Sequence, residues 1–407
     1  MQAPERFSAL PDYAFPRLRT LLGDTPPGAD PVEMTIGDPR HDPPAFVGAT
    51  VAEHAAAFRG YPPNEGHPDL RAAIADWVAA RYGARPDPDA EVMVLNGTRE
   101  GLYNVAMALA PEQKGGATPT VLVPNPFYQV YAVAALSVAA EPVYMDADPA
   151  TGLPDLDALD PAALDRAALV YLCSPANPQG AVAPLAYWDR LLRLAERHDF
   201  VVVADECYSE IYRGAPPPGV LEAVRTGGHD PERAVAFHSL SKRSNLAGLR
   251  SGFAVSGPGN VARMKQLRNY AGAPLPLPLQ HAAAAAWRDE AHVEANRALY
   301  AQKFADAERL LGDVPGVAIP EAGFFLWLPV PEGGPDRGDG GAAALRLWRD
   351  AGVKVLPGAF LAREGAGGNP GRGFVRAALV APRAEAAEGM ARLRAHLYDP
   401  TTPRGTE

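Results

Sequence analysis

The sequence of 407 residues has few cysteines, no excess of positive charge and no long hydrophobic run. Its two cysteines, Cys173 and Cys207, form no CxxC pair, so we expect two reduced buried thiols and neither a disulfide nor a metal site. Lysine and arginine number 38 against 48 aspartates and glutamates, which gives a formal net charge of −10. An acidic chain without a clustered basic face excludes nucleic acid as the default partner.

The hydrophobic runs are too short for a membrane protein. The longest ones, residues 133–140 and 282–287, fall well below the roughly 20 residues that a membrane helix needs. The first residues carry charges at Glu5, Arg6 and Asp12 and lack the apolar core of a signal peptide. We therefore expect a cytoplasmic protein without a membrane partner.

From about residue 90 onward, short β-branched runs alternate with longer amphipathic stretches. The runs read EVMVLNG, TVLVPNP, AALVYLCSP, FVVVADE and AVAFHSLS, and helical patterns cover residues 98–109, 128–138 and 185–199. Continuous apolar strands separated by helices are typical of a parallel sheet that is covered on both faces. The core of the chain is predicted to be α/β.

A different pattern follows. A long helical pattern after Pro278 breaks near its middle and ends at Gly312, and beyond it short strands and helices alternate. The expected strands lie in GVAIP, GFFLWLPV, VKVLPG and GFVRAALV, and the expected helices cover residues 342–351 and 383–397. This mixture predicts a smaller α+β domain. We expect an N-terminal arm packed on the small domain at 1–45, a large domain at 46–290 and the small domain at 291–407.

Polar residues gather where the predicted strands end, which is where open α/β sheets bind ligands. Lys242 follows a strand, with Ser239 and Ser241 before it and Arg250 after it. A desolvated lysine among cations has a lowered pKa and acts as a nucleophile. The serines and the arginine suit a bound phosphate. Taken alone, such a segment is more often a solvated lysine at a strand end.

Four other strand ends each have two interpretations. Asp205 ends FVVVAD, and as a buried carboxylate it needs a cation such as a protonated pyridine nitrogen, or it caps a helix. Asn177 offers an amide donor or forms a turn. The segment Gly97-Thr98 opens a helix, as an anion site or a plain cap. Tyr128 stacks on a flat ring or packs in the core.

In their order and spacing, these motifs resemble one family along nearly the whole chain. GTRE, PNPFYQVY, SPANPQG, DECY, SLSK and FVRAAL are similar to the motifs of fold type I pyridoxal-phosphate aminotransferases of class I/II. The resemblance implies a large domain with a mainly parallel seven-stranded sheet between helices, and a smaller α+β domain. It also implies pyridoxal 5′-phosphate as cofactor, amino-acid and 2-oxo-acid substrates, no metal, and a homodimer with shared active sites.

The resemblance implies a role for each matching residue. Lys242 matches the lysine that bonds to the cofactor and moves the substrate proton, and Asp205 matches the partner of the pyridine nitrogen. Asn177 and Tyr208 match the residues that hold the ring oxygen O3′, and Tyr128 matches the residue stacked on the ring.

The remaining matches concern the phosphate and the substrate. The phosphate site corresponds to Thr98, the backbone N–H of Arg99, Ser239 and Arg250. Tyr61 matches a tyrosine that reaches the phosphate of the neighbouring subunit, which implies the dimer. Arg376 matches the arginine that clamps the substrate α-carboxylate, with Gly37 and Asn177 beside it.

A narrower resemblance concerns the substrate. SKRSNLAGLRSGF and LPGAFLARE are similar to segments of the proteobacterial succinyldiaminopimelate aminotransferases of lysine biosynthesis. This implies N-succinyl-LL-diaminopimelate as amino donor, 2-oxoglutarate as acceptor and ping-pong kinetics. The chain departs from that pattern at Asn64-Glu65 and at residues 270–280, which lack a histidine expected there.

Alternatives stay open on the substrate and on the bond that is broken. The motifs also fit aspartate, aromatic or alanine aminotransferases, and a C–S β-lyase or a decarboxylase, because they specify the cofactor chemistry and not the reaction. A succinyl carboxylate calls for a distal cation. The candidates are Arg40, Arg99 and Arg243, each of which also fits a surface or structural arginine.

Overall fold

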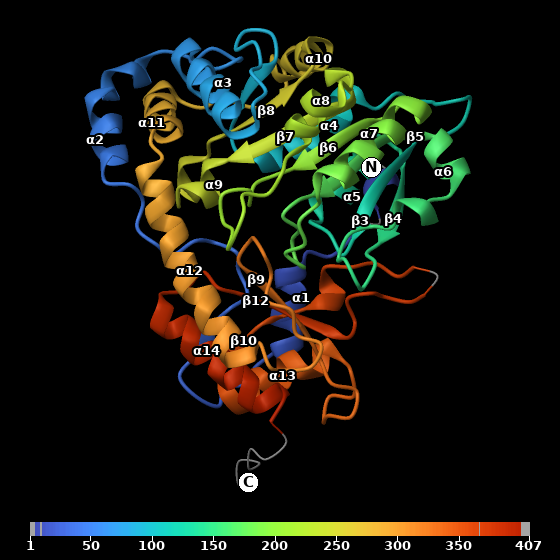
Figure 1. Ribbon diagram of the computed structural model, residues 1–407, viewed down its shortest axis with the longest axis vertical. Coiled ribbons are helices and arrows are strands. Elements are labelled where there is room, and N and C mark those ends of the chain that lie inside the picture. Colours follow the sequence, from blue (N-terminus) through green and yellow to red (C-terminus); the bar gives the residue numbers. More distant parts are fainter. Residues whose placement is uncertain (1–4, 9, 366, 400–407) are drawn as a thin grey trace.

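The computed structural model describes residues 5–8, 10–365 and 367–399 (Figure 1). Its central sheet has seven strands. In spatial order they are β2 (Val92–Leu95), β8 (Gly252–Ser256), β7 (Ala234–Ser239), β6 (Val201–Asp205), β5 (Ala167–Cys173), β3 (Thr120–Asn125) and β4 (Glu141–Asp146). Strand β8 runs antiparallel to both its neighbours, and every other neighbouring pair in this sheet is parallel. The predicted mainly parallel seven-stranded sheet is confirmed.

Strands β4 and β8 are the two that the apolar runs do not reveal. Strand β4 lies at the edge of the sheet, begins and ends with acidic residues and contains Pro142, which an edge strand tolerates. Strand β8 (GFAVS) has one β-branched residue, Val255, and begins with Gly252, where a Cβ would lie 2.8 Å from the carbonyl oxygen of His238 on β7. Both strands therefore lack the long β-branched run of the others.

Helices cover both faces of this sheet because successive side chains of each strand point to opposite faces. Val92 and Val94 of β2 belong to one hydrophobic cluster, whereas Met93 and Leu95 belong to another. The first cluster includes α3 (Pro68–Tyr82), α7 (Leu185–His198), α8 (Val220–Gly227) and α11 (Leu277–Arg288). The second includes α4 (Thr98–Leu109), α5 (Val130–Ser137) and α10 (Pro258–Arg268). We call this body, with α2 (Phe46–Glu53), α6 (Pro161–Asp165) and α9 (Leu240–Arg243), the large lobe.

A second body, the small lobe, is built on a three-stranded antiparallel sheet. Its strands are β11 (Leu356–Pro357), β12 (Phe374–Ala378) and β9 (Phe325–Pro329), in that spatial order. Its helices are α13 (Gly340–Ala351) and α14 (Arg383–Leu397). The N-terminal segment joins it, since α1 (Ala14–Leu22) packs on Leu356 and β1 (Val32–Glu33) pairs with β10 (Val353–Lys354).

The strand expected at residues 316–320 is absent there. These residues form no strand, because Gly316 has a φ of +81° and Pro320 has no N–H to donate. Of the other expected strand segments, GFFLWLPV contains β9, VKVLPG contains β10 and β11, and GFVRAALV contains β12. The helix predicted at residues 383–397 has the bounds of α14.

Helix α12 (Ala291–Leu311) runs from the large lobe into the small lobe (Figure 1). The predicted boundary at residue 290 falls between the end of α11 and the start of α12. The division of the chain into three parts stays a prediction. In the described part of the chain, every helix is too short or too polar to cross a membrane.

Candidate active site

A cavity of about 340 Å³ opens at the carboxyl ends of β5, β6 and β7, where the large lobe meets β12 and the N-terminal segment. Its size suits a small-molecule ligand. All the predicted site residues except Tyr61 line it, and these are Gly37, Thr98, Arg99, Tyr128, Asn177, Asp205, Tyr208, Ser239, Lys242, Arg250 and Arg376. Cys207 also lines the cavity, whereas Cys173 is buried, and both thiols are free.

Tyr61 lies apart from this cavity. Its side chain is fully exposed, at 102% of the reference area, on the large lobe before α3. Its predicted role concerns the cavity of a neighbouring subunit and stays a prediction.

Lys242 reaches the cavity from α9, which follows directly after β7. The side chain of Ser239 caps α9 by accepting a hydrogen bond from the N–H of Ser241 at 3.1 Å. The Nζ of Lys242 donates to the carbonyl oxygen of Gly37. Burial lowers the pKa of the Lys242 amine to about 8, so a useful fraction is neutral and nucleophilic near neutral pH.

Asp205 is a buried carboxylate at the end of β6, with only 5% of its surface exposed. Its Oδ2 accepts a hydrogen bond from the hydroxyl of Tyr131 at 2.6 Å, and its Oδ1 accepts from the N–H of Cys207 at 3.3 Å. Both donors are neutral, and burial raises the pKa of Asp205. A cation placed in the cavity beside this carboxylate would stabilise its charged form.

Tyr131 is a functional candidate that the sequence analysis missed. It is completely buried, and its ring packs edge-on at 5.7 Å against that of Tyr128, which lies three residues before it and just ahead of α5. The available signal was this spacing in PNPFYQVY.

A candidate anion site lies at the N-terminus of α4. Gly97 precedes the helix with a φ of +84°, and a Cβ at that position would lie 2.0 Å from Nη2 of Arg250. The hydroxyls of Ser239 and Ser241 lie 2.9 Å apart at the edge of the same cavity. Unpaired N–H groups of the first helical turn beside Thr98, a guanidinium and two hydroxyls together suit a phosphate.

A second anion site surrounds Arg376 on β12. Its Nη1 donates to Oδ1 of Asn177 at 2.9 Å and its Nη2 donates to the carbonyl oxygen of Thr35 at 2.6 Å. The guanidinium lies over the ring of Phe325 at 4.1 Å, and its buried Nε has no hydrogen-bond partner among the described residues. Burial lowers the pKa of Arg376 to about 10. A buried guanidinium with neutral partners and a spare N–H fits a carboxylate.

Two tyrosines of the cavity, Tyr128 and Tyr208, are neutral phenols. Burial raises the pKa of Tyr128 to about 12, and its hydroxyl oxygen accepts a hydrogen bond from Nε of Arg99 at 2.7 Å. Burial raises the pKa of Tyr208 well above its ordinary value, and its ring packs edge-on against Phe324 at 5.3 Å. Tyr208 can therefore donate a hydrogen bond at physiological pH.

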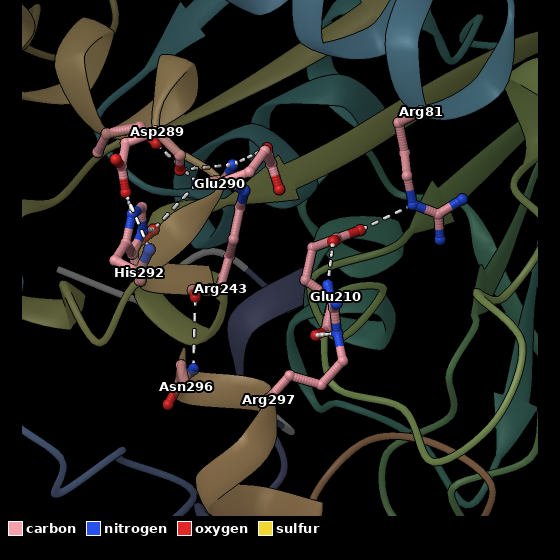
Figure 2. A network of polar contacts seen from close by, with 10 residues as sticks. Arg81, Glu210, Arg243, Asp289, Glu290, His292, Asn296 and Arg297 are labelled. Carbon is pink, nitrogen blue, oxygen red and sulfur yellow. Dashed lines mark hydrogen bonds and ion pairs between the residues drawn. The ribbon is translucent and has the colours of Figure 1, made fainter. Parts of the chain in front are cut away.

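Of the three candidates for the distal cation, only Arg99 lines the cavity. The interpretation of Arg243 as the distal cation is wrong. Its guanidinium is 2% exposed, packs on the rings of Trp77 and Trp287 and is paired with Glu290 (Figure 2). Arg40 is half exposed, is paired with Glu385 at 2.6 Å and does not line the cavity of its own chain. Asp38, which the sequence analysis did not select, does line it, directly after Gly37.

These features fit a single compound class. A neutral amine suits an aldehyde, the buried carboxylate of Asp205 suits a protonated pyridine nitrogen, and the N-terminus of α4 suits a phosphate. The cavity therefore suits pyridoxal 5′-phosphate, and Arg376 suits a substrate carboxylate.

The chain belongs to the class I and II aminotransferases, whose family model matches residues 29–389. It is 31% identical over 402 residues to an LL-diaminopimelate aminotransferase of Dehalococcoides mccartyi, covering 97% of this chain and 98% of that relative. An aminotransferase structure from Neisseria meningitidis has a TM-score of 0.91 and 36% identity, covering 96% of this chain and 99% of that one. A probable N-succinyldiaminopimelate aminotransferase from Thermus thermophilus has a TM-score of 0.82 and 28% identity, covering 94% and 100%.

The predicted family and fold type are therefore confirmed. The protein is an aminotransferase with the fold type I architecture, and its cofactor is pyridoxal 5′-phosphate.

Proposed function

We propose that the protein transfers the α-amino group of N-succinyl-LL-diaminopimelate to 2-oxoglutarate, with ping-pong kinetics. The observation that supports this choice of amino donor is that Arg99 lines the cavity in addition to Arg250 and Arg376. Arg376 suits the α-carboxylate and Arg250 the cofactor phosphate. Arg99 donates to Tyr128 through Nε, and its two NH₂ groups suit the terminal carboxylate of a succinyl group. The likeness to the Thermus thermophilus structure supports this donor.

Bound pyridoxal 5′-phosphate supplies an electron sink for the electrons left at the substrate Cα. In this proposal Lys242 would hold the cofactor until the amine of the donor takes its place there. The freed Lys242 amine would then act as general base and acid, removing the Cα proton and returning it to the cofactor carbon that the donor nitrogen joins. The carboxylate of Asp205 holds a proton at the pyridine nitrogen. Arg376 and the backbone of Gly37 fix the α-carboxylate, so that the Cα proton faces Lys242.

The other residues hold the cofactor in the same proposal. Asn177 and Tyr208 donate hydrogen bonds to its ring oxygen, and the bond from Arg376 to Oδ1 of Asn177 leaves the Asn177 NH₂ group available as donor. Tyr128 packs on the ring face. The phosphate is bound by Thr98, the Arg99 N–H, Ser239 and Arg250.

A second candidate donor is free LL-diaminopimelate, whose distal end carries an ammonium group. Asp38 lines the cavity and would pair with that ammonium. The LL-diaminopimelate aminotransferase of Dehalococcoides mccartyi, at 31% identity, supports this alternative.

Two matched variants distinguish these donors. We expect Arg99→Ala to lower kcat/KM for the succinylated donor by roughly 10-fold to 150-fold, since a charge-assisted hydrogen bond contributes about 1.5–3 kcal/mol. Asp38→Asn should leave that value within threefold. The reverse pattern, with free LL-diaminopimelate as the better donor, would replace the first proposal by the second.

Further donors test the remaining alternatives. Turnover of aspartate, phenylalanine or alanine above both diaminopimelate compounds would favour the corresponding aminotransferase. Release of pyruvate and ammonia from cystathionine would favour a C–S β-lyase. Convergent lines in initial-rate plots would contradict ping-pong kinetics.

We also propose a homodimer in which Tyr61 of each copy reaches the cavity of the other. Its complete exposure in the single chain supports this arrangement. Sedimentation should give twice the chain mass of 43.0 kDa. Mixing Lys242→Ala and Tyr61→Ala chains should restore activity, because one site of the mixed dimer then has both side chains; no recovery after proven exchange of subunits would contradict the shared site. The cytoplasmic location stays a prediction.

A further inference from the structure

Asn296 is a buried amide near the start of α12, the helix that runs between the two lobes (Figures 1 and 2). Its Nδ2 donates to the main-chain carbonyl oxygen of Lys242 at 3.3 Å and to that of Arg243 at 3.4 Å. Because carbonyl oxygens only accept, these two contacts fix which end of the amide is the nitrogen. Asn296 therefore holds the backbone of the residue that carries the cavity amine.

The other end of the same amide faces the N-terminal segment. Its Oδ1 accepts from Nδ2 of Asn245 at 3.1 Å and lies 2.9 Å from Nδ1 of His41, which must carry the ring proton to donate there. His41 also packs on the ring of Tyr300 from α12, at 4.9 Å. It lies four residues after Gly37, whose carbonyl accepts from Nζ of Lys242. Asn296 thus links the Lys242 turn, α12 and the segment that lines the cavity.

The rest of the turn is anchored to the large lobe without Asn296. The guanidinium of Arg243 donates to the carbonyl oxygen of Ala286 at 2.8 Å and is paired with Glu290 (Figure 2). The hydroxyl of Ser244 lies 2.8 Å from Nε2 of His292. These contacts fix residues 243 and 244, so loss of the Asn296 amide would free Lys242 without releasing the whole turn.

We propose that Asn296 is a positioning residue for Lys242, which it ties to the cavity segment around Gly37 through His41. This inference rests on the proposed role of Lys242. A proton transfer requires donor and acceptor near hydrogen-bond distance, and a misplacement of about 1 Å costs on the order of 100-fold in rate. Loss of the hydrogen bond from Asn296 to the backbone carbonyl of Lys242 would allow the Lys242 amine to be displaced in this way.

The substitution Asn296→Asp tests this. It keeps the size and the oxygen that faces Asn245 and His41, but it replaces the donor to the Lys242 and Arg243 carbonyls by an acceptor. We expect kcat to fall about 10-fold to 100-fold with every amino donor, while KM for the donor changes less than threefold. Asn296→Ala removes the same bonds without adding charge and should show the same fall in kcat with a nearly unchanged KM. This second variant provides the test if Asn296→Asp does not fold.

A readout without turnover separates positioning from damage to the cavity. The apoprotein variants should bind pyridoxamine 5′-phosphate, which forms no bond to a lysine, with a Kd within threefold of the unaltered protein. Their covalent capture of pyridoxal 5′-phosphate, followed by visible absorbance, should slow about 10-fold or more. Asn260→Asp is the matched control, since Asn260 is also buried and donates to a carbonyl, that of Glu232 at 2.7 Å, but its amide binds Glu232 and Ser256 and not the Lys242 turn. It should leave kcat and the capture rate unchanged.

Wild-type kcat and capture rate in both Asn296 variants would overturn the inference and leave the proposed function intact. Loss of pyridoxamine 5′-phosphate binding in step with kcat would also overturn it, because Asn296 would then only support the cavity. The proposed function fails separately, if a Lys242→Ala protein still captures pyridoxal 5′-phosphate covalently.

Discussion

Replacing Tyr131 by phenylalanine removes the hydroxyl that donates a hydrogen bond to Asp205 and keeps the aromatic ring. The Tyr131 hydroxyl donates to Oδ2 of Asp205 at 2.6 Å, and both residues are buried. A hydrogen bond to a charged group contributes about 1.5–3 kcal/mol. The ionised form of Asp205 loses that stabilisation in the variant, which raises the pKa of the carboxyl group, so the proton it shares with the pyridine nitrogen shifts toward Asp205. We expect kcat to fall roughly 10-fold to 150-fold, since about 1.4 kcal/mol corresponds to a factor of ten.

The assay combines steady-state kinetics at saturating cofactor with a pH titration of the cofactor's visible absorbance. The absorbance transition should shift in Tyr131→Phe, because the charge on Asp205 acts directly on the ring. Tyr171→Phe is the matched control: its ring stacks on Tyr131 at 4.9 Å, but its hydroxyl donates to the carbonyl of Leu102 at 2.8 Å. It should lower stability by about 1 kcal/mol and leave kcat unchanged. An unaltered kcat and titration in Tyr131→Phe would refute the reasoning.

Three further predictions concern the amine and the two anion sites. The rate of covalent capture of pyridoxal 5′-phosphate by the apoprotein should rise with pH, reach half its maximum near pH 8 and level off above that, because only the neutral Lys242 amine reacts and its pKa is lowered to about 8; a stopped-flow rate that still climbs at pH 10 would contradict this. Gly97→Ala should weaken cofactor binding at least 10-fold by fluorescence titration, since its Cβ would lie 2.0 Å from Nη2 of Arg250 at a φ that disfavours alanine; unchanged binding would show that Arg250 moves freely. Arg376→Lys should raise KM for amino donors about 10-fold or more with unchanged cofactor affinity, because a lysine cannot make the paired N–H contacts to a carboxylate; an unchanged KM would remove Arg376 from the substrate site.

The convergence of Lys242 and Asp205 was predictable from the sequence for a simple reason. Each follows a run of apolar residues, and the carboxyl ends of parallel strands meet at one edge of the sheet. Arg376 is different, since it arrives from another lobe, and only the resemblance to a family connected it with the cavity.

Side-chain direction was the part that the sequence could not supply. Arg243 directly follows Lys242, yet its guanidinium points into the core, where it packs against the rings of Trp77 and Trp287. The bond from Tyr131 to Asp205 joins residues 74 positions apart and follows from no local pattern. Asn296 lies inside an ordinary helical sequence, and its contacts with Lys242 and His41 exist only in the folded chain.

The central claim is that Lys242 is the residue that bonds to pyridoxal 5′-phosphate. Borohydride reduction of the holoenzyme followed by peptide mass spectrometry tests it most directly, because reduction makes the bond permanent. Lys303 is the lysine to compare with Lys242 in this labelling, since it is buried and its pKa is likewise lowered to about 8. We predict one pyridoxyl group per chain on the peptide that contains Lys242. A label on Lys303 or any other lysine, or no label at all, would contradict the account.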